Sequence, residues 1–362
     1  MMTNSPALYL HVPFCAHICF YCDFCHQVYD RKKAERWLSA LRQEMKERLT
    51  FQPFTIYLGG GTPTVLPLDQ LDELLCLLDP YKDVKEYTIE INPETFDEKK
   101  AECLKRHGIN RASIGLQSAS AEELRSLGRH HDLEDVKRTL QLLHAVGIDN
   151  VSLDILYSFP GQTKESFRNT LQTAVSLAPA HLSLYSLTIE ENSVFGKQGK
   201  QPLPEDTEAD FYEYAVSFLE RNGYEQYEVA NFAKDGQYSR HNLVYWHYED
   251  FLGLSMGASS KLGHERSDNT RSLEEYCRGN WIKERIPLCE KDEMFEMTMM
   301  NLRLKEGLSE KRFRERFGRD FADVYPEALQ KLQEKGWICK KEDHWVVNDR
   351  EILNTVLLEF LD

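Results

Sequence analysis

The sequence lacks the features that mark several classes of protein. Basic side chains do not outnumber acidic ones, because 44 Lys and Arg stand against 59 Asp and Glu, for a formal net charge of −15. A binding stripe for the phosphate backbone of nucleic acid is therefore not expected. No apolar run approaches the ~20 residues that cross a bilayer. Residues 1–6 contain neither the basic region nor the apolar core of a secretion signal. We expect no nucleic-acid partner and no stable membrane anchor.

Cysteine is present, but not in the pattern of a disulfide-stabilised protein. Four of the nine cysteines, at positions 15, 19, 22 and 25, are clustered near the start of the chain. Such clustering fits a reducing compartment better than a disulfide framework, so we expect a cytoplasmic protein. With 362 residues, 41% of them hydrophobic, the chain can bury a sizeable core and hold two domains.

Strand-like and helix-like segments alternate through the first two thirds of the chain. This alternation predicts a parallel sheet covered by helices. Six units favour an α/β fold with an open, partial (β/α)6 barrel, and a doubly wound sheet is the alternative. The expected strands are 7–14, 54–58, 87–91, 111–117, 150–157 and 181–189, and the expected helices are 33–49, 68–78, 98–107, 133–146, 164–177 and 206–222.

The pattern changes after residue 292, where helices precede a β-rich stretch at 337–347. We expect a small helical domain with a wing-like hairpin. The predicted domains are the barrel at 1–225, an extension of the barrel at 226–289 and the C-terminal domain at 290–362. The sequence leaves open whether the last of these covers the barrel mouth or docks a partner.

Cys15, Cys19 and Cys22 carry the most specific signal in the chain. Their spacing suits three thiolate ligands of one iron–sulfur cluster, one fewer than the four irons of a cubane. An iron without a protein ligand can bind a small molecule. The spacing resembles the signature of the radical S-adenosylmethionine (SAM) superfamily, which implies a 4Fe-4S cluster and SAM as cofactors. A structural zinc site with Cys25 as the fourth ligand is the alternative, although no second Cys/His pair follows downstream.

Polar residues near the ends of the predicted strands form a second group. In β/α barrels the chemistry lies at the carboxyl ends of the strands, where 59–63, Glu90 and Gln117 fall, and Asp154 lies within the fifth strand. The glycines let the backbone approach a ligand closely. Either carboxylate can accept hydrogen bonds from ribose hydroxyls, and Gln117 and Arg129 can bind a carboxylate. Taken alone, a Gly-rich run is more often just a turn and a Glu or Gln at a strand end is usually solvated, but together these residues predict one ligand site.

Four segments extend the resemblance over nearly the whole chain. YLHVPFC at 9–15, YLGGGTPT at 57–64, IGLQS at 114–118 and DILYSFPGQT at 154–163 resemble the oxygen-independent coproporphyrinogen oxidase group. This resemblance implies reductive cleavage of SAM to methionine and a 5′-deoxyadenosyl radical. It also implies that SAM is bound by Tyr9, Gly60, Gly61, Thr62, Glu90, Gln117, Arg129 and Asp154.

Three features resemble the HemW family of heme chaperones more than the oxidases. Phe24 stands where the oxidases have a fourth cysteine, and fourteen residues precede Cys15 where the oxidases have a long segment. HNLVYW at 241–246 is similar to a motif associated with heme in HemW proteins. The resemblance implies heme binding by His241, Asn242, Tyr245 and Trp246. A neutral imidazole can ligate heme iron, but composition alone favours a buried histidine in an aromatic strand cluster.

The resemblance implies a heme chaperone that passes heme to acceptor hemoproteins, with membrane respiratory enzymes among the expected acceptors. Oxidative decarboxylation of coproporphyrinogen III is the alternative function, and a radical oxidoreductase on another substrate is the third. Whether the protein cleaves SAM productively is left open. A cluster-bridged homodimer is conceivable, since three cysteines leave one iron exposed.

Cys25 departs from the pattern of both families. A cluster ligand under oxidation, a sulfur ligand of heme iron and an inert thiol are the three possibilities, and the usual burial of free cysteine favours the inert thiol. His17 and His26 flank the cluster loop, and we expect them to be exposed loop residues.

Overall fold

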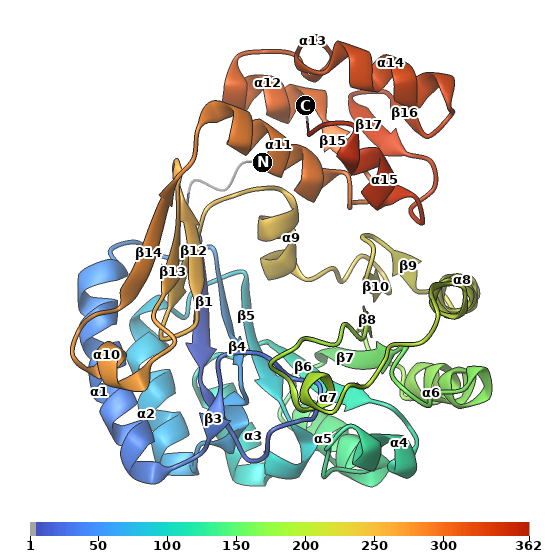
Figure 1. The fold of residues 1–362 in the computed structure, drawn as a ribbon. Coiled ribbons are helices and arrows are strands. Elements are labelled where there is room, and N and C mark those ends of the chain that lie inside the picture. Colours follow the sequence, from blue (N-terminus) through green and yellow to red (C-terminus); the bar gives the residue numbers. More distant parts are fainter. Residues whose placement is uncertain (1–4, 362) are drawn as a thin grey trace.

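A computed structural model describes residues 5–361, with residues 1–4 and 362 outside it, and its centre is a sheet of twelve strands (Figure 1). The strand order is β14-β13-β12-β11-β1-β4-β5-β6-β7-β8-β10-β9. These strands are β1 (Ala7–Val12), β4 (Thr55–Gly60), β5 (Glu86–Ile91), β6 (Arg111–Gln117), β7 (Asn150–Tyr157), β8 (His181–Ser186), β9 (Glu225–Gln226), β10 (Asn231–Ala233), β11 (Phe251–Leu254), β12 (Ser259–Leu262), β13 (Glu265–Asn269) and β14 (Ile282–Pro287).

Most helices lie on the outside of this curved sheet, as Figure 1 shows, whereas the one at Arg240–Trp246 contacts its inner face. The helices of the first part are α1 (Arg31–Arg48), α2 (Leu68–Leu78), α3 (Glu98–Arg106), α4 (Ala121–Ser126), α5 (Leu133–Ala145), α6 (Lys164–Ser176), α7 (Val194–Lys197), α8 (Glu205–Arg221), α9 (Arg240–Trp246) and α10 (Leu273–Cys277). Short 3-10 turns are η1 (Pro63–Val65), η2 (Asp79–Tyr81) and η3 (Pro93–Thr95), and a small two-stranded sheet pairs β2 (Phe14–Cys15) with β3 (Gln27–Val28).

Six strands, β1 and β4 to β8, run parallel in chain order, which confirms the α/β fold with a partial barrel. The sequence did not reveal a seventh parallel strand, β11, which pairs with the other edge of β1 (Ala7↔Phe251). A four-residue strand is too short to show a period of two. The antiparallel strands β12–β14 and β9–β10 then extend the sheet at its two edges.

Local sequence signals set the starts of the covering helices. Asp30 and Asp97 each accept a hydrogen bond from the backbone N–H three residues later and so cap α1 and α3. Asp132 and Thr163 form reciprocal capping boxes at α5 and α6. Each such cap satisfies a backbone donor that would otherwise lack an intrahelical partner.

The two faces of the sheet differ in character because side chains alternate along each strand. Ile56 and Leu58 of β4 and Ile89 of β5 are buried in the core beneath the helices. Thr55 and Tyr57, with the opposite parity, face the barrel interior, where their registered neighbours are Glu86 and Thr88. The interior face is therefore polar and the outer face apolar, which places chemistry inside the barrel.

The C-terminal segment has its own apolar core, which includes Phe313, Phe321, Leu332, Trp345 and Val356. Its hairpin of β16 and β17, with β15 alongside β17, confirms the β-rich stretch predicted there. The elements are α11 (Glu290–Asn301), β15 (Leu308–Ser309), α12 (Glu310–Phe317), α13 (Phe321–Val324), α14 (Pro326–Glu334), β16 (Ile338–Lys341), β17 (His344–Val347) and α15 (Leu353–Leu358).

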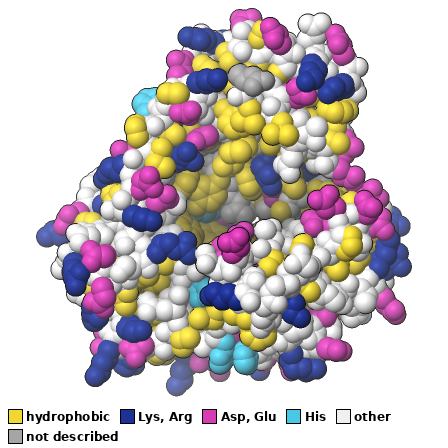
Figure 2. All heavy atoms as spheres, viewed as in Figure 1, with side chains coloured by type: hydrophobic (Ala, Val, Ile, Leu, Met, Phe, Trp, Pro, Cys, Tyr) yellow, Lys and Arg dark blue, Asp and Glu magenta, His cyan; other side chains and the backbone are white. Residues whose placement is uncertain are grey.

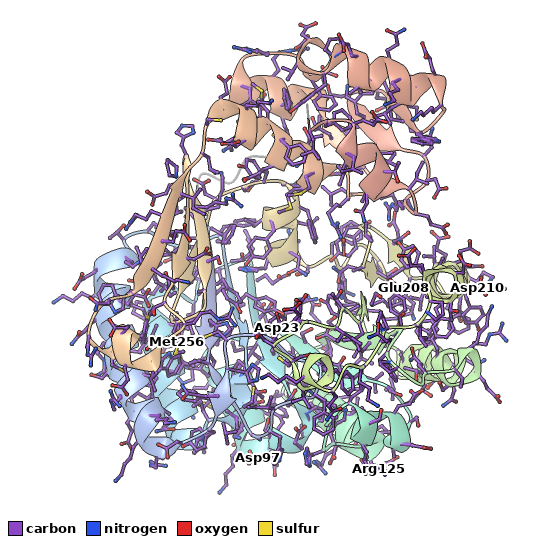
Figure 3. All side chains as sticks on the ribbon, in the orientation of Figure 1. Asp23, Asp97, Arg125, Glu208, Asp210 and Met256 are labelled. Carbon is purple, nitrogen blue, oxygen red and sulfur yellow. The ribbon has the colours of Figure 1, made fainter. Side chains whose placement is uncertain are left out.

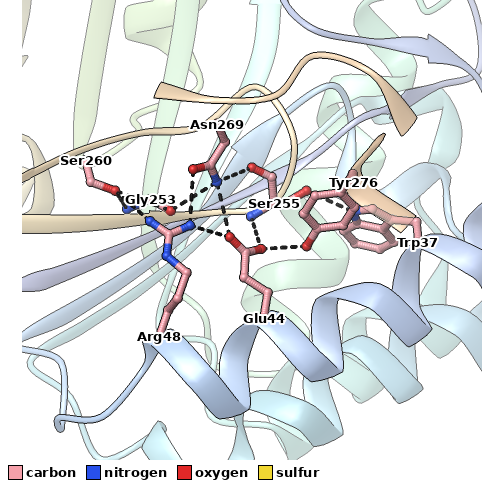
Figure 4. Close-up of polar contacts among 8 residues, drawn as sticks. All are labelled: Trp37, Glu44, Arg48, Gly253, Ser255, Ser260, Asn269 and Tyr276. Carbon is pink, nitrogen blue, oxygen red and sulfur yellow. Dashed lines mark hydrogen bonds and ion pairs between the residues drawn. The ribbon is translucent and has the colours of Figure 1, made fainter. Parts of the chain in front are cut away.

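A buried carboxylate, Glu44 of α1, ties that helix to the edge of the sheet (Figure 4). Its oxygens accept hydrogen bonds from the Tyr276 hydroxyl at 2.6 Å and the Ser255 amide at 2.8 Å. Arg48 forms an ion pair with the same carboxylate and donates to Asn269 Oδ1 at 3.1 Å. The network fixes the turn between β11 and β12, which packs against the cysteine loop described below.

The surface carries charges of both signs. Figure 2 shows acidic and basic side chains intermixed over one face, with apolar side chains gathered in a recess below the C-terminal helices. Among residues 5–361, none of the helices combines the length and apolar character that a bilayer span requires.

Candidate functional site

The cysteine loop leaves β1 and lies across the open barrel. The backbone N–H of Phe20 donates to Leu127 O at 3.0 Å, and that of Phe195 donates to Phe20 O at 2.8 Å, so contacts with the end of α4 and with α7 hold the loop. In Figure 3, Asp23 of this loop lies near the centre of the view, and Met256, in the turn between β11 and β12, lies to its left. The Arg271 guanidinium donates to Asp23 O at 2.9 Å, so the segment that follows β13 holds the loop as well.

Cys15, Cys19 and Cys22 line one cavity of about 420 Å³ inside the barrel. Burial raises the pKa of the Cys15 thiol to about 12 and that of Cys22 to about 11. These thiols are therefore protonated near neutral pH, and binding a metal group through them must release protons. The Arg129 guanidinium lies 3.6 Å from Cys19 Sγ and provides a positive charge beside the three sulfurs.

The arrangement of the three thiols bears on which kind of metal group they could hold. Zn–S bonds of about 2.3 Å keep two sulfur ligands of one ion within roughly 4.6 Å of each other. Within residues 5–361, the side chains that bring three ligand atoms within 4.8 Å of one another belong to other groups, around His107, and not to the loop cysteines. The loop thiols are therefore not drawn together as the ligands of one ion, and three thiols on one cavity are a donor set that suits a 4Fe-4S cluster.

Cys25, the proposed fourth zinc ligand, is separated from this cavity. Its side chain is buried against the β11–β12 turn, and Sγ donates to Arg271 O at 3.7 Å. A Cβ built on Gly257 would lie 2.3 Å from Cys25 Cβ, so this thiol fills the space beside a glycine. Phe24 is 64% exposed at the rim. His17 is exposed as expected, whereas His26 is half-buried.

Most of the predicted SAM-binding residues line the same cavity. Beyond the cysteines, the lining includes Gly60, Gly61, Thr62, Glu90, Gln117, Arg129 and Asp154. Tyr9 is not part of that lining, because its hydroxyl is turned toward His11 Nδ1 at 3.0 Å. The structure therefore brings together seven of the eight and places Tyr9 behind them.

The glycine run is required by close backbone contacts. A Cβ at Gly61 would lie 2.5 Å from Phe14 O, and Gly60 has φ of +106°. The amides of Gly61 and Thr62 donate to Val12 O at 2.8 Å and Phe14 O at 2.7 Å. The run is thus held directly against the start of the cysteine loop, with Thr62 Oγ1 3.9 Å from Cys15 Sγ.

Glu90 is held by two donors at the cavity wall. Tyr57 donates to its Oε1 at 2.8 Å and the Gly60 amide to its Oε2 at 3.1 Å. Burial, with a smaller contribution from the Asp154 carboxylate, raises the pKa of Glu90 to about 7. Burial also raises the pKa of Asp154, whose oxygens accept from Ser113 Oγ at 3.0 and 3.1 Å.

Arg129 is buried and oriented by its neighbours. Its guanidinium donates to Asn92 Oδ1 at 2.9 Å and Gly115 O at 3.4 Å. Its Nε is buried without a hydrogen-bond partner, a feature that a bound anionic group in the cavity would explain. Gln117, in a bulge of β6 with φ of +61°, points its amide into the same space.

Several lining residues were missed by sequence reasoning. Tyr57, Asn92, Ser113 and Tyr185 also line the cavity. Tyr57 and Ser113 have the strand parity of the interior face, so alternation along β4 and β6 could have identified them. Asn92 lies in a loop, and only the tertiary structure reveals its contact with Arg129.

The residues of the predicted heme motif form α9, a short helix rather than a strand. His241 is 1% exposed, and both ring nitrogens are engaged, Nδ1 with Thr55 Oγ1 at 2.9 Å and Nε2 with the Tyr245 hydroxyl at 2.7 Å. Asn242, Tyr245 and Trp246 are half-buried. His241 is thus a buried histidine in an aromatic cluster, as its composition favoured, and neither nitrogen is free to ligate iron without breaking a contact.

Comparisons with known proteins agree with this geometry. The Radical SAM superfamily profile matches residues 9–174, and the HemN C-terminal domain profile matches residues 288–353. The chain is 36% identical over 351 residues to the heme chaperone HemW of Bacillus subtilis (strain 168), covering 92% of this chain and 93% of that protein. It is 32% identical to the heme chaperone HemW of Escherichia coli (strain K12), covering 98% of each.

Among solved structures, the coproporphyrinogen III oxidase HemN from Escherichia coli, described as a radical SAM enzyme, superposes with a TM-score of 0.86. The two chains are 25% identical, and the match covers 98% of this chain and 90% of that one. The match includes the C-terminal segment as well as the barrel.

Proposed function

The chain belongs to the HemW family of the radical SAM superfamily, and on that premise we propose that it binds heme and passes it to acceptor hemoproteins. The observation that carries the proposal is the 36% identity with a heme chaperone across 92% of this chain. The oxidase alternative is less supported, by the HemN structure at 25% identity and by the HemN C-terminal domain profile over residues 288–353.

We propose that Cys15, Cys19 and Cys22 hold a 4Fe-4S cluster and that the cavity beside them binds SAM. When bound, the cluster supplies the electron that cleaves the sulfonium of SAM. Arg129 would pair with the carboxylate of the methionine moiety, while Glu90 or Asp154 would accept hydrogen bonds from the ribose. The backbone at Gly60, Gly61 and Thr62, the amide of Gln117 and the supporting Tyr9 complete the proposed site.

SAM affinity is expected to rise with pH through the pKa of Glu90. The carboxylate accepts hydrogen bonds best when ionised, and its pKa is about 7. Below that value the association constant should fall, by up to about tenfold per pH unit, since one proton must be released. Calorimetric titration of the cluster-loaded protein across this range measures the effect. Glu90→Gln is the control, because the titrating groups of SAM itself are the same for both proteins. An association constant that changes with pH as steeply in Glu90→Gln as in wild type would contradict the prediction.

The heme role of His241, Asn242, Tyr245 and Trp246 is part of the proposal. Two forms of it can be distinguished, because both nitrogens of His241 are engaged. Direct ligation of iron would require α9 to open and release the imidazole. An indirect role would leave the contacts of His241 intact. The half-buried Asn242 and Trp246 would then lie nearer to the heme than His241 does.

An anaerobic heme titration of the cluster-loaded protein, followed by absorbance, tests the carrier function. Saturable binding near one heme per chain is expected. His241→Ala should weaken binding and remove the spectrum of an imidazole-ligated iron if the ligand is His241, and should keep that spectrum if the role is indirect. Circular dichroism checks that the variant is folded. Absence of specific binding by wild type would contradict the proposal and direct attention to coproporphyrinogen turnover.

We also propose a cytoplasmic location and, from the resemblance, acceptors that include membrane respiratory enzymes. A cluster-bridged homodimer and a partner-docking role for the C-terminal segment remain predictions. The acidic net charge of −15 is unfavourable for anionic lipid surfaces, so contact with a membrane would be made through the acceptor.

A further inference from the structure

The N-terminal end of α9 is fixed inside the barrel. The backbone amides of Arg240 and His241 both donate to the Glu86 carboxylate at 2.9 Å. Glu86 is buried at the start of β5, and Thr55, at the start of β4, bonds the His241 ring at 2.9 Å. Three contacts from two adjacent strands therefore determine where the His241 imidazole lies.

The imidazole is neutral, and each of its two nitrogens takes part in a hydrogen bond. Burial, with a smaller effect of Arg111, lowers the pKa of His241 to about 3. The Tyr245 hydroxyl bonds Nε2 at 2.7 Å, and the Tyr245 ring packs edge-on to the imidazole with centroids 5.1 Å apart. The ring is thus held in one orientation across the physiological pH range.

The other neighbour of the imidazole is Tyr57, which reaches the cavity. The rings of His241 and Tyr57 lie 5.1 Å apart at 31°. Tyr57 is also packed beside Tyr9, at 6.1 Å, and a Cβ at Gly59 would lie 2.7 Å from its ring. Its hydroxyl donates to Glu90 Oε1 at 2.8 Å. One side chain therefore connects α9 with the carboxylate at the cavity wall.

We infer that His241 is a positioning residue for the SAM cavity: its imidazole holds the Tyr57 ring so that the Tyr57 hydroxyl orients Glu90. This inference rests on the proposed function in one respect, the binding of SAM in the cavity. It gives the heme-associated motif a second task, on the side of α9 that faces the barrel interior.

A second buried histidine provides a matched control. His181 is fully buried in β8, and its nitrogens bond Ser152 Oγ and the Tyr227 hydroxyl, both at 2.8 Å. Its side chain does not line the cavity. His181→Phe therefore removes the same kind of contacts from the barrel interior without removing a contact of Tyr57.

The test compares SAM binding by the cluster-loaded wild type, His241→Phe, Tyr57→Phe and the double variant. His241→Phe should weaken SAM binding by roughly five- to tenfold, the loss expected when a charge-assisted hydrogen bond is misaligned. The pH midpoint of binding should also move upward, because the Tyr57 bond lowers the pKa of Glu90. The other titratable groups around this carboxylate, Asp154, Tyr9, Tyr185 and Tyr245, are unchanged in Tyr57→Phe and are the same in each pair compared.

The double variant gives the sharpest result. If His241 acts through Tyr57, the second substitution lowers SAM affinity little beyond the first. If the two residues act independently, their fold-losses of affinity would multiply. Normal SAM affinity and an unshifted midpoint in His241→Phe, or an equal effect in His181→Phe, would overturn the inference. If His241→Phe does not fold, Thr55→Val removes the hydroxyl at Nδ1 and should move both quantities in the same direction; no movement would overturn the inference. Failure of wild type to bind SAM would instead contradict the proposed function.

Discussion

Cys19→Ser is expected to remove iron and sulfide from the protein, whereas Cys25→Ser is expected to leave both near the wild-type content. Cys19 lies in the cavity with Cys15 and Cys22, beside the Arg129 guanidinium. A cluster held by three thiolates is no longer stably bound when one of the thiolates is removed. Cys25 is buried behind the loop against Gly257 and does not line the cavity.

Chemical analysis of iron and sulfide per chain after anaerobic reconstitution measures this difference. Circular dichroism of each variant controls for folding. Equal loss of iron in both variants would show that Cys25 is a ligand, and zinc in place of iron in protein purified without reconstitution would restore the four-cysteine alternative.

Glu44→Ala is expected to reduce the free energy of unfolding by about 3–5 kcal/mol, since removal of one partner leaves Arg48 uncompensated and other donors unpaired. Glu44 is fully buried, and it joins α1 to Ser255 and Tyr276 near the sheet edge. The turn between β11 and β12, which contains Ser255, packs against Cys25. The cysteine loop should therefore also become more susceptible to proteolysis in Glu44→Ala. Urea unfolding followed by circular dichroism gives the shift of the midpoint.

Glu47→Ala provides the matched control on the same helix. Glu47 is exposed, and its substitution should change stability by no more than ~0.5 kcal/mol. The loss of stability in Glu44→Gln should fall between those of Glu44→Ala and Glu47→Ala. The amide oxygen still accepts a hydrogen bond, but it no longer balances the charge of Arg48. A loss below about 1 kcal/mol in Glu44→Ala would contradict the view that this network holds the turn.

The strands of the barrel could be predicted because each carries a local signal. The runs that became β4 to β8 are apolar on the face covered by helices, and Asp97, Asp132 and Thr163 mark helix starts. β11 could not be predicted, because its four residues pair with β1 across more than 240 positions of sequence. Pairing over that distance depends on the whole sheet and leaves no periodic trace in a short segment.

The candidate site likewise has residues that the sequence could identify and neighbours that it could not. Cys15, Cys19 and Cys22 were identified by spacing within eight residues, and the structure places all three on one cavity. The neighbours that tune the site come from separate elements. Asn92 orients Arg129, and Tyr57 orients Glu90. Neither contact has a sequence signal of its own.

The sequence by itself determined that the chain forms an α/β barrel with a three-cysteine loop at the end of its first strand. Local spacing and alternation carry that information, because they reflect the geometry of single turns and strands. Only the tertiary structure decided that Cys25 faces away from the other three cysteines and that His241 is enclosed beside Tyr57. Burial and hydrogen-bond partners depend on which distant segments pack together, and these decide whether a thiol or an imidazole is free to bind a ligand.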